Sequence, residues 1–235
     1  MCYGLFIDPR YLLFILPAFI LMIAVQWYVN SCYSKWSKVA ARSRMSGAQA
    51  AQRLIQSGGL YDVRVEGVQG KLTDHYDPRQ KVLRLSQGVY EGQSVAALAI
   101  AAHELGHALQ DRDDYLPLRF RAALVPMVSV GSYLGWFLIM IGFLLGFTGL
   151  AWLGVAVFSG GALFALATLP VELNASARAK RLLVDSGLIV GADEQQGVNQ
   201  VLNAAALTYV AALVTAVLQL LYWITLLLGV GGRRD

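Results

Sequence analysis

Long apolar runs alternate with polar stretches along this chain. Each run has 19 residues or more and contains no Lys, Arg, Asp, Glu or His. A helix of that length can cross roughly 30 Å of hydrocarbon. No small-residue cleavage site follows the first run, so a retained signal-anchor is favoured over a cleaved signal peptide. The pattern therefore predicts four transmembrane helices, at Tyr11–Val29, Ala122–Gly146, Leu150–Val171 and Ala204–Val230.

The first polar stretch, residues 31–121, has the pattern of a small α+β fold. A short helix is expected to begin at a serine cap and to end at Gly58-Gly59. Alternating large and charged residues favour a strand after it. The turn signal Asp77-Pro78-Arg79 favours a hairpin. We expect a short antiparallel sheet ahead of a longer helix. The elements are a helix at Ser46–Ile55, a strand at Tyr61–Val65, a hairpin of Lys71–Tyr76 and Gln80–Ser86, and a helix at Ser94–Gln110.

The second polar stretch, residues 172–203, is predicted to be helical. One helix covers Glu172–Ser186 and stops at Gly187, and another, Glu194–Ala206, continues into the last apolar run. The fold class is therefore a membrane α-helical protein with a small α+β portion outside the membrane. Its segments are an N-terminal transmembrane helix (1–30), the α+β portion (31–121), a transmembrane hairpin (122–171), a helical segment (172–203), and a C-terminal transmembrane helix with a tail (204–235).

Composition and charge place this portion on one side of the membrane. The chain is 57% apolar and only 14% charged, which is typical of a membrane protein. Two spans separate Asn30–Arg121 from Glu172–Asn203, so both lie on the same side, and together they hold 16 of the 19 Lys and Arg residues. The positive-inside rule assigns that side to the cytoplasm and both termini to the outside. This bias accounts for the net charge of +4, and no nucleic-acid partner is needed.

Glycines recur at a spacing of four in the second apolar run. The pairs are Gly131 with Gly135 and Gly142 with Gly146. This spacing suits close helix packing in lipid, and the third run is the candidate partner because the link between the two runs is short. Glycine is also common in transmembrane helices in general. The sequence leaves both readings open.

The most informative motif is His103-Glu104-Leu105-Gly106-His107. Residues four apart share one face of a helix, so the two imidazoles can bind one metal ion and the glutamate can reach a water on it. The alternative is a surface helix with chance polar residues. Apolar residues before and after the motif argue against that alternative, because a solvent-facing helix would be more polar. We expect a helix that is buried on most sides and turns one polar face to a metal.

A catalytic zinc needs a third protein ligand and an open position for water. Glu172 is the best candidate, because it follows an apolar run directly and a buried carboxylate requires a metal or a cation. It could instead be a glutamate favoured by the dipole at the start of a helix. Asp185 and His75 are lesser rivals. The three aspartates after the motif are expected to face solvent; they are Asp111, Asp113 and Asp114.

Two further residues are candidates for stabilising the charge that develops on the substrate. His75 lies next to the predicted hairpin turn and could contact a peptide from an edge strand, or it could be an ordinary surface histidine. Tyr209 lies near the start of the last apolar run. A tyrosine there also fits the aromatic belt at a membrane surface. Both assignments stay open.

Several motifs together resemble a known family. The chain from about Ser34 to Tyr222 is similar to the YugP-type family of bacterial membrane zinc metallopeptidases and, more distantly, to the HtpX and CaaX prenyl protease group. In that group a Glu-x-x-x-Asp helix completes the zinc site. Glu172 matches the glutamate, whereas Ser176 replaces the aspartate. The motifs are Leu72–Pro78, Ala101–Gln110, Leu169–Ser176 and Leu202–Tyr209.

The resemblance implies a zincin-like fold, a Zn²⁺ cofactor and peptide hydrolysis in the bacterial inner (cytoplasmic) membrane. The expected function is a multi-pass zinc metalloendopeptidase with His103, His107 and Glu172 as ligands and Glu104 as general base. Its active site would face the cytoplasm close to the membrane. The expected partners are a peptide or membrane-protein substrate and the lipid bilayer. The sequence leaves open whether other proteins bind as well.

Three other functions compete with this interpretation. In an intramembrane protease of the site-2 type the motif lies within a span, but the apolar run around it here, Val95–Leu109, has only about 15 residues. A transporter would be expected to carry ionisable groups in its spans, and the predicted spans have none. A zinc-binding scaffold without catalysis remains, although such a scaffold has no use for Glu104.

Overall fold

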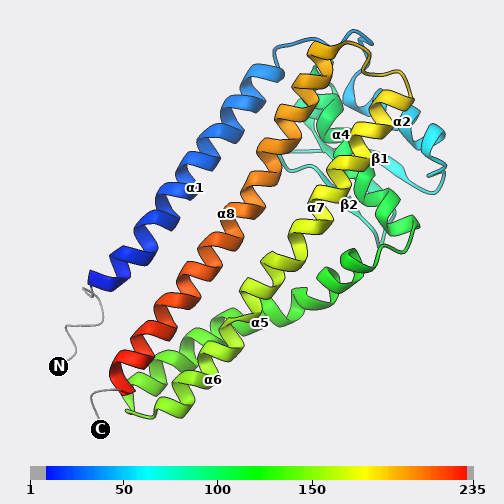
Figure 1. The fold of residues 1–235 in the computed structure, drawn as a ribbon. Coiled ribbons are helices and arrows are strands. Elements are labelled where there is room, and N and C mark those ends of the chain that lie inside the picture. The colour runs from blue at the N-terminus through cyan, green and yellow to red at the C-terminus, as the bar shows by residue number, and fades with distance from the viewer. Residues whose placement is uncertain (1–8, 232–235) are drawn as a thin grey trace. The chain divides into compact units, whose positions relative to one another are not determined.

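The computed structural model describes residues 9–231, so Arg233 and Arg234 of the predicted outer side lie outside the described residues. The chain forms two compact units. The helical unit contains the described residues among 1–25, 119–169 and 208–235, and the sheet unit contains residues 26–118 and 170–207. Figure 1 shows the elements. They are α1 (Pro9–Trp36), α2 (Gly47–Gly58), β1 (Arg64–Val68), β2 (His75–Asp77), β3 (Val82–Ser86), α3 (Gln87–Tyr90), α4 (Val95–Arg112), α5 (Leu116–Leu144), α6 (Thr148–Phe158), α7 (Gly160–Asp185) and α8 (Ala192–Gly231).

Three helical stretches in the described residues are long and apolar enough to cross a membrane: Tyr11–Trp36, Thr148–Asp185 and Ala192–Gly229. The second predicted span falls on α5, which bends by 47° between Leu116–Pro126 and Val128–Leu144. A proline inside a helix lacks the N–H for one backbone hydrogen bond, and its ring clashes with the preceding turn. The structure thus has three such stretches, and a fourth only if the two halves of α5 form one span.

Close packing of α5 against α6 explains part of the glycine pattern. A Cβ atom on Gly135 would lie within 2.9 Å of Gly154 and Phe158, and one on Gly142 would lie within 2.9 Å of Ala151. These glycines let the two backbones approach. Gly146 has a different role, because its φ of 66° is left-handed and its N–H bonds to the Phe143 carbonyl as the helix ends.

The sheet is mixed, which corrects the predicted antiparallel sheet. Its strand order is β1-β3-β2, with β2 antiparallel to β3 and β1 parallel to β3. The apolar strand β3 takes the centre, where Leu83 and Leu85 are fully buried. The hairpin therefore inserts β3 between β1 and β2. The predicted first strand is also shifted, since Tyr61 is 81% exposed and precedes β1.

Helix α4 lies at the centre of the sheet unit. Ser94 caps it by accepting a hydrogen bond from the Ala97 N–H (3.2 Å). Its side chains pack against α2, against the sheet and against residues of α7 and α8 in one apolar core. Of its 18 residues, 12 are buried, so α4 is not a surface helix. The predicted stops at Gly59 and Gly187 are confirmed, as both have a left-handed φ at a helix end.

Replacing Gly142 by alanine should destabilise the α5–α6 hairpin. The new methyl group would meet the Ala151 backbone, and overpacking of this kind costs about 1–3 kcal/mol. The matched control is Gly160→Ala, because a Cβ atom there meets nothing within 4 Å. Thermal unfolding in detergent should show a lower midpoint for Gly142→Ala alone. Equal midpoints for the two variants would refute this packing.

Candidate metal centre

Two helices of the sheet unit bring three candidate ligands together. His103 and His107 lie one turn apart on α4, and their rings are 4.9 Å apart between centroids. Glu172 lies on α7 and is 2% exposed. Its Oε2 atom lies 3.2 Å from Nε2 of His103 and 3.5 Å from Nε2 of His107. The candidate ligand atoms of all three residues lie within 4.8 Å of one another.

A close approach of the two helices positions these side chains. A Cβ atom on Gly106 would lie within 3.1 Å of three backbone atoms of Ala175. Only glycine therefore fits at this position of α4. Because Gly106 precedes His107 and Ala175 lies one turn after Glu172, the contact sets the distance between the imidazoles and the carboxylate.

Each imidazole also has a partner on its second nitrogen. Nδ1 of His103 lies 3.1 Å from the Ser176 hydroxyl, and Nδ1 of His107 lies 3.0 Å from Oε1 of Gln110. Histidine ligands of metals usually hold their other nitrogen in this way. Ser176 thus occupies the place that the resemblance gives to an aspartate. The partner of Nδ1 of His103 is therefore a neutral hydroxyl and not a carboxylate.

Glu104 lies beside the cluster with its carboxylate uncommitted. It is half-buried on α4, and within residues 9–231 its side chain forms no hydrogen bond or ion pair. Burial lowers the pKa of His107, but hydrogen bonding to Glu172 and the nearby Glu104 charge outweigh it, so that pKa is raised. A carboxylate with a free lone pair next to the candidate ligands can accept a proton.

The three donors fit zinc. Zinc takes nitrogen and oxygen ligands at about 2.0–2.2 Å in a tetrahedron, so its ligands lie about 3.3–3.5 Å apart. The distances from Glu172 Oε2 to Nε2 of His103 and His107, 3.2 and 3.5 Å, match two edges of such a tetrahedron. Three ligands leave the fourth position open, as in catalytic zinc sites.

Comparison with known proteins decides the family. Residues 11–228 match the model of a family described as "Putative neutral zinc metallopeptidase". The chain belongs to this family. It is also 47% identical over 210 residues to "Putative membrane protease YugP" of Bacillus subtilis (strain 168), a match that covers 89% of this chain and 92% of that protein. No solved structure matches the chain.

Membership of the zinc metallopeptidase family confirms two predictions from the sequence. The resemblance to YugP-type proteins is confirmed directly. The family also implies Zn²⁺ as the cofactor, and the His-His-Glu group is a cluster that could hold it. Of the other proposed third ligands, Asp185 is exposed at the end of α7 and His75 is exposed on β2; neither belongs to that group.

The structure does not bring His75 to the cluster. The next residue, Tyr76, packs against the core, and its hydroxyl donates to Asp111 of α4 (2.8 Å). Alternation along β2 therefore turns His75 to the opposite face of the sheet. Its Nδ1 lies 2.8 Å from the Thr73 carbonyl oxygen. Strand β2 is an edge strand, so contact of His75 with a substrate stays a prediction.

Tyr209 also stays untested. It is half-buried on α8 and belongs to the helical unit, whereas the cluster belongs to the sheet unit. Of the aspartates expected to face solvent, Asp113 and Asp114 are exposed. Asp111 is not, because it accepts hydrogen bonds from Tyr76 and, at 2.7 Å, from Lys81.

Sequence reasoning missed the positions that support the ligands. Gly106 stands inside the motif, where a glycine could have suggested a close helix contact. Gln110 was a recognisable signal too, since it is a polar residue one turn after His107 in an apolar helix, and it is fully buried. Neither signal identifies the residue on α7 that lies opposite.

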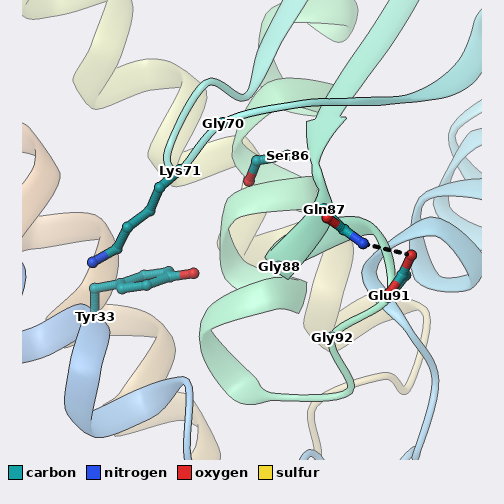
Figure 2. A pocket seen from close by; sticks show the side chains of 8 residues that line it. All are labelled: Tyr33, Gly70, Lys71, Ser86, Gln87, Gly88, Glu91 and Gly92. Atoms are coloured by element: carbon teal, nitrogen blue, oxygen red, sulfur yellow. Dashed lines mark hydrogen bonds between the residues drawn. The ribbon is translucent and has the colours of Figure 1, made fainter.

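A separate cavity lies elsewhere in the sheet unit (Figure 2). Its volume is about 500 Å³, and its lining contains none of the three candidate ligands. The Lys71 ammonium lies 5.5 Å from the ring centre of Tyr33, and across the cavity Gln87 donates to Glu91 (3.4 Å). The cavity thus offers a cation and a carboxylate but no metal cluster.

Gly106→Ala should weaken zinc binding without touching a ligand. Its methyl group would push α4 away from Ala175 and separate the imidazoles from Glu172. Displacing positioning groups around a zinc site typically costs about 10–100-fold in affinity. The control is Gly58→Ala, whose Cβ atom would make only ordinary contacts from 3.7 Å. Chelator competition measures both, and wild-type affinity in Gly106→Ala would show that the close contact does not set the site.

Proposed function

We propose that this protein is a zinc metalloendopeptidase that hydrolyses peptide bonds close to the cytoplasmic face of the bacterial inner membrane. The observation that carries the proposal is the meeting of two imidazoles and a buried carboxylate in one cluster, with the half-buried Glu104 beside His107. Membership of a zinc metallopeptidase family and similarity to a protein named as a membrane protease support it. Glu172 is proposed as the third zinc ligand, with His103 and His107.

The proposed chemistry needs four side chains. A zinc ion held by these ligands would lower the pKa of a water toward about 7 and polarise the carbonyl of the substrate. Glu104 takes a proton from the water as its oxygen bonds to the carbonyl carbon. Glu104 then passes that proton to the nitrogen of the leaving amine as the C–N bond breaks. The products are a carboxylate and an amine, and Glu104 returns to its starting state.

The proposed substrate is a membrane protein or a peptide delivered along the membrane. Glu172 directly follows the apolar run that ends at Val171, and Arg121 stands only 14 residues after His107. Along a helix at 1.5 Å per residue, a ligand next to the end of a span lies within about 5–10 Å of the membrane face. A substrate held at the membrane could reach such a site directly.

A zinc-binding scaffold without proteolytic activity is the second candidate. It would use the same three ligands, so metal content alone cannot separate the two functions. Glu104 separates them, because a scaffold gains nothing from a half-buried carboxylate that forms no hydrogen bond or ion pair within the described residues. The uncommitted Glu104 therefore favours catalysis.

Glu104→Gln should abolish most activity while keeping the metal. Glutamine preserves the shape of the side chain but cannot act as a base, and losing a general base costs about 10²–10⁴-fold in rate. Cleavage of a panel of membrane proteins and casein, together with zinc content, measures both effects. The control is Glu91→Gln, the same change at an exposed residue of the sheet unit. A Glu104→Gln variant that cleaves as fast as the wild type would refute the peptidase mechanism.

The proposed orientation can be tested by labelling. Single cysteines at Lys38 or Lys180, in a chain without its two native cysteines, should react with an impermeant maleimide only after cells are permeabilised, because 16 of the 19 basic residues fall on the predicted cytoplasmic side. A cysteine at Phe147, which is 62% exposed in the α5–α6 link, should react in intact cells. The reverse pattern would overturn the proposed orientation and the cytoplasmic site.

A further inference from the structure

Gln110 is fully buried and lies where α4 packs against α7, in contact with His107. Its Oε1 atom lies 3.0 Å from Nδ1 of His107. Its Nε2 group donates to the carbonyl oxygen of Val171 (2.8 Å) and to Oδ1 of Asn174 (3.0 Å), both on α7. All the polar atoms of this side chain are thus engaged.

The hydrogen-bond partners of Gln110 determine which end of its amide is the oxygen and which is the NH₂ group. The Val171 carbonyl oxygen can only accept a hydrogen bond. Oδ1 of Asn174 is also held as an acceptor, because Nε of Arg178 donates to it (2.8 Å), and a guanidinium has no acceptor. Rotating the Gln110 amide by 180° would set its oxygen against these two oxygens. Its Oε1 atom must therefore face His107.

That direction influences where the hydrogen on His107 lies. Since Oε1 of Gln110 can only accept, this contact at 3.0 Å favours the tautomer in which Nδ1 of His107 carries the hydrogen and donates it. Glu172, at 3.5 Å, is the acceptor that competes from the Nε2 side. In the neutral imidazole this leaves the lone pair on Nε2, the nitrogen that faces Glu172 at 3.5 Å. His103 differs, because the Ser176 hydroxyl beside its Nδ1 (3.1 Å) can either donate or accept.

We propose that Gln110 is a positioning residue that fixes His107 in the tautomer able to bind zinc through Nε2. The Arg178 guanidinium sets the direction of the hydrogen bonds through Asn174, and Asp113 holds that guanidinium from the end of α4 (2.5 Å). An ion pair near the surface thereby orients the partly buried His107 through two amides. This inference rests on the proposed zinc site, but it concerns the free imidazole and not the reaction.

The first test needs no variant. The chain has three histidines, so nitrogen NMR of the full-length protein, stripped of metal with a chelator and held at about pH 9, can resolve each ring. The proposal expects His107 with its hydrogen on Nδ1 and a bare Nε2. A predominantly Nε2-protonated His107 in this spectrum would overturn it, whether or not the protein is a peptidase.

The second test uses substitutions at the two amides. Gln110→Met keeps the size of the side chain and removes its hydrogen bonds, so His107 should shift toward the Nε2-protonated tautomer and zinc affinity should fall about 10–100-fold. Asn174→Asp keeps an acceptor for both Gln110 and Arg178 and should retain the wild-type tautomer. Gln56→Met, the same change at an exposed residue of α2, is the control.

These outcomes separate positioning from structure. A Gln110→Met variant that keeps both the wild-type tautomer and the wild-type zinc affinity contradicts the proposal. If that variant fails to fold, the spectrum of the wild type and that of Asn174→Asp decide instead. Because a tautomer is measured without metal or substrate, a scaffold protein with no peptidase activity would still support or refute the role of Gln110.

Discussion

The close crossing of α4 and α7 is the constraint on which the rest of the site depends. At Gly106 the backbone of Ala175 comes so near that no side chain fits between them. This approach lets a carboxylate on one helix reach two imidazoles on the other, and it lets Gln110 bond to the α7 backbone. The core beneath α4, built from alanine and leucine side chains, keeps the helix in that place.

The crossing also makes a buried charge tolerable. Glu172 is 2% exposed, and an unpaired carboxylate with so little access to water would be strongly unfavourable. The two imidazoles face it at 3.2 and 3.5 Å, and a bound cation would compensate the charge further. At the end of α4, Arg178 pairs with Asp113. The hydrogen bond from Arg178 is the main reason why the pKa of the Asp113 carboxyl is lowered. The two helices are therefore joined by polar groups as well as by apolar packing.

Features that depend on local sequence patterns were predicted better than features that depend on long-range contacts. The spacing of His103 and His107 follows from helix geometry alone, and the stops at Gly59 and Gly187 follow from left-handed glycines. The parallel pairing of β1 with β3 was not predictable, because it depends on which strand takes the apolar centre. Gly106 and Gln110 were missed for a related reason, since their roles depend on atoms of α7 about 60–70 positions away in the chain.

The central claim is that these two helices together bind one zinc ion through two imidazoles and a carboxylate. X-ray absorption at the zinc edge on the purified full-length protein tests it most directly, because imidazole rings give a distinct multiple-scattering signal. The account predicts one zinc per chain with two imidazole nitrogens and oxygen ligands at about 2.0–2.2 Å, and the loss of the oxygen contributed by Glu172 in Glu172→Ala. A spectrum with fewer than two imidazoles, or one unchanged by Glu172→Ala, would contradict it.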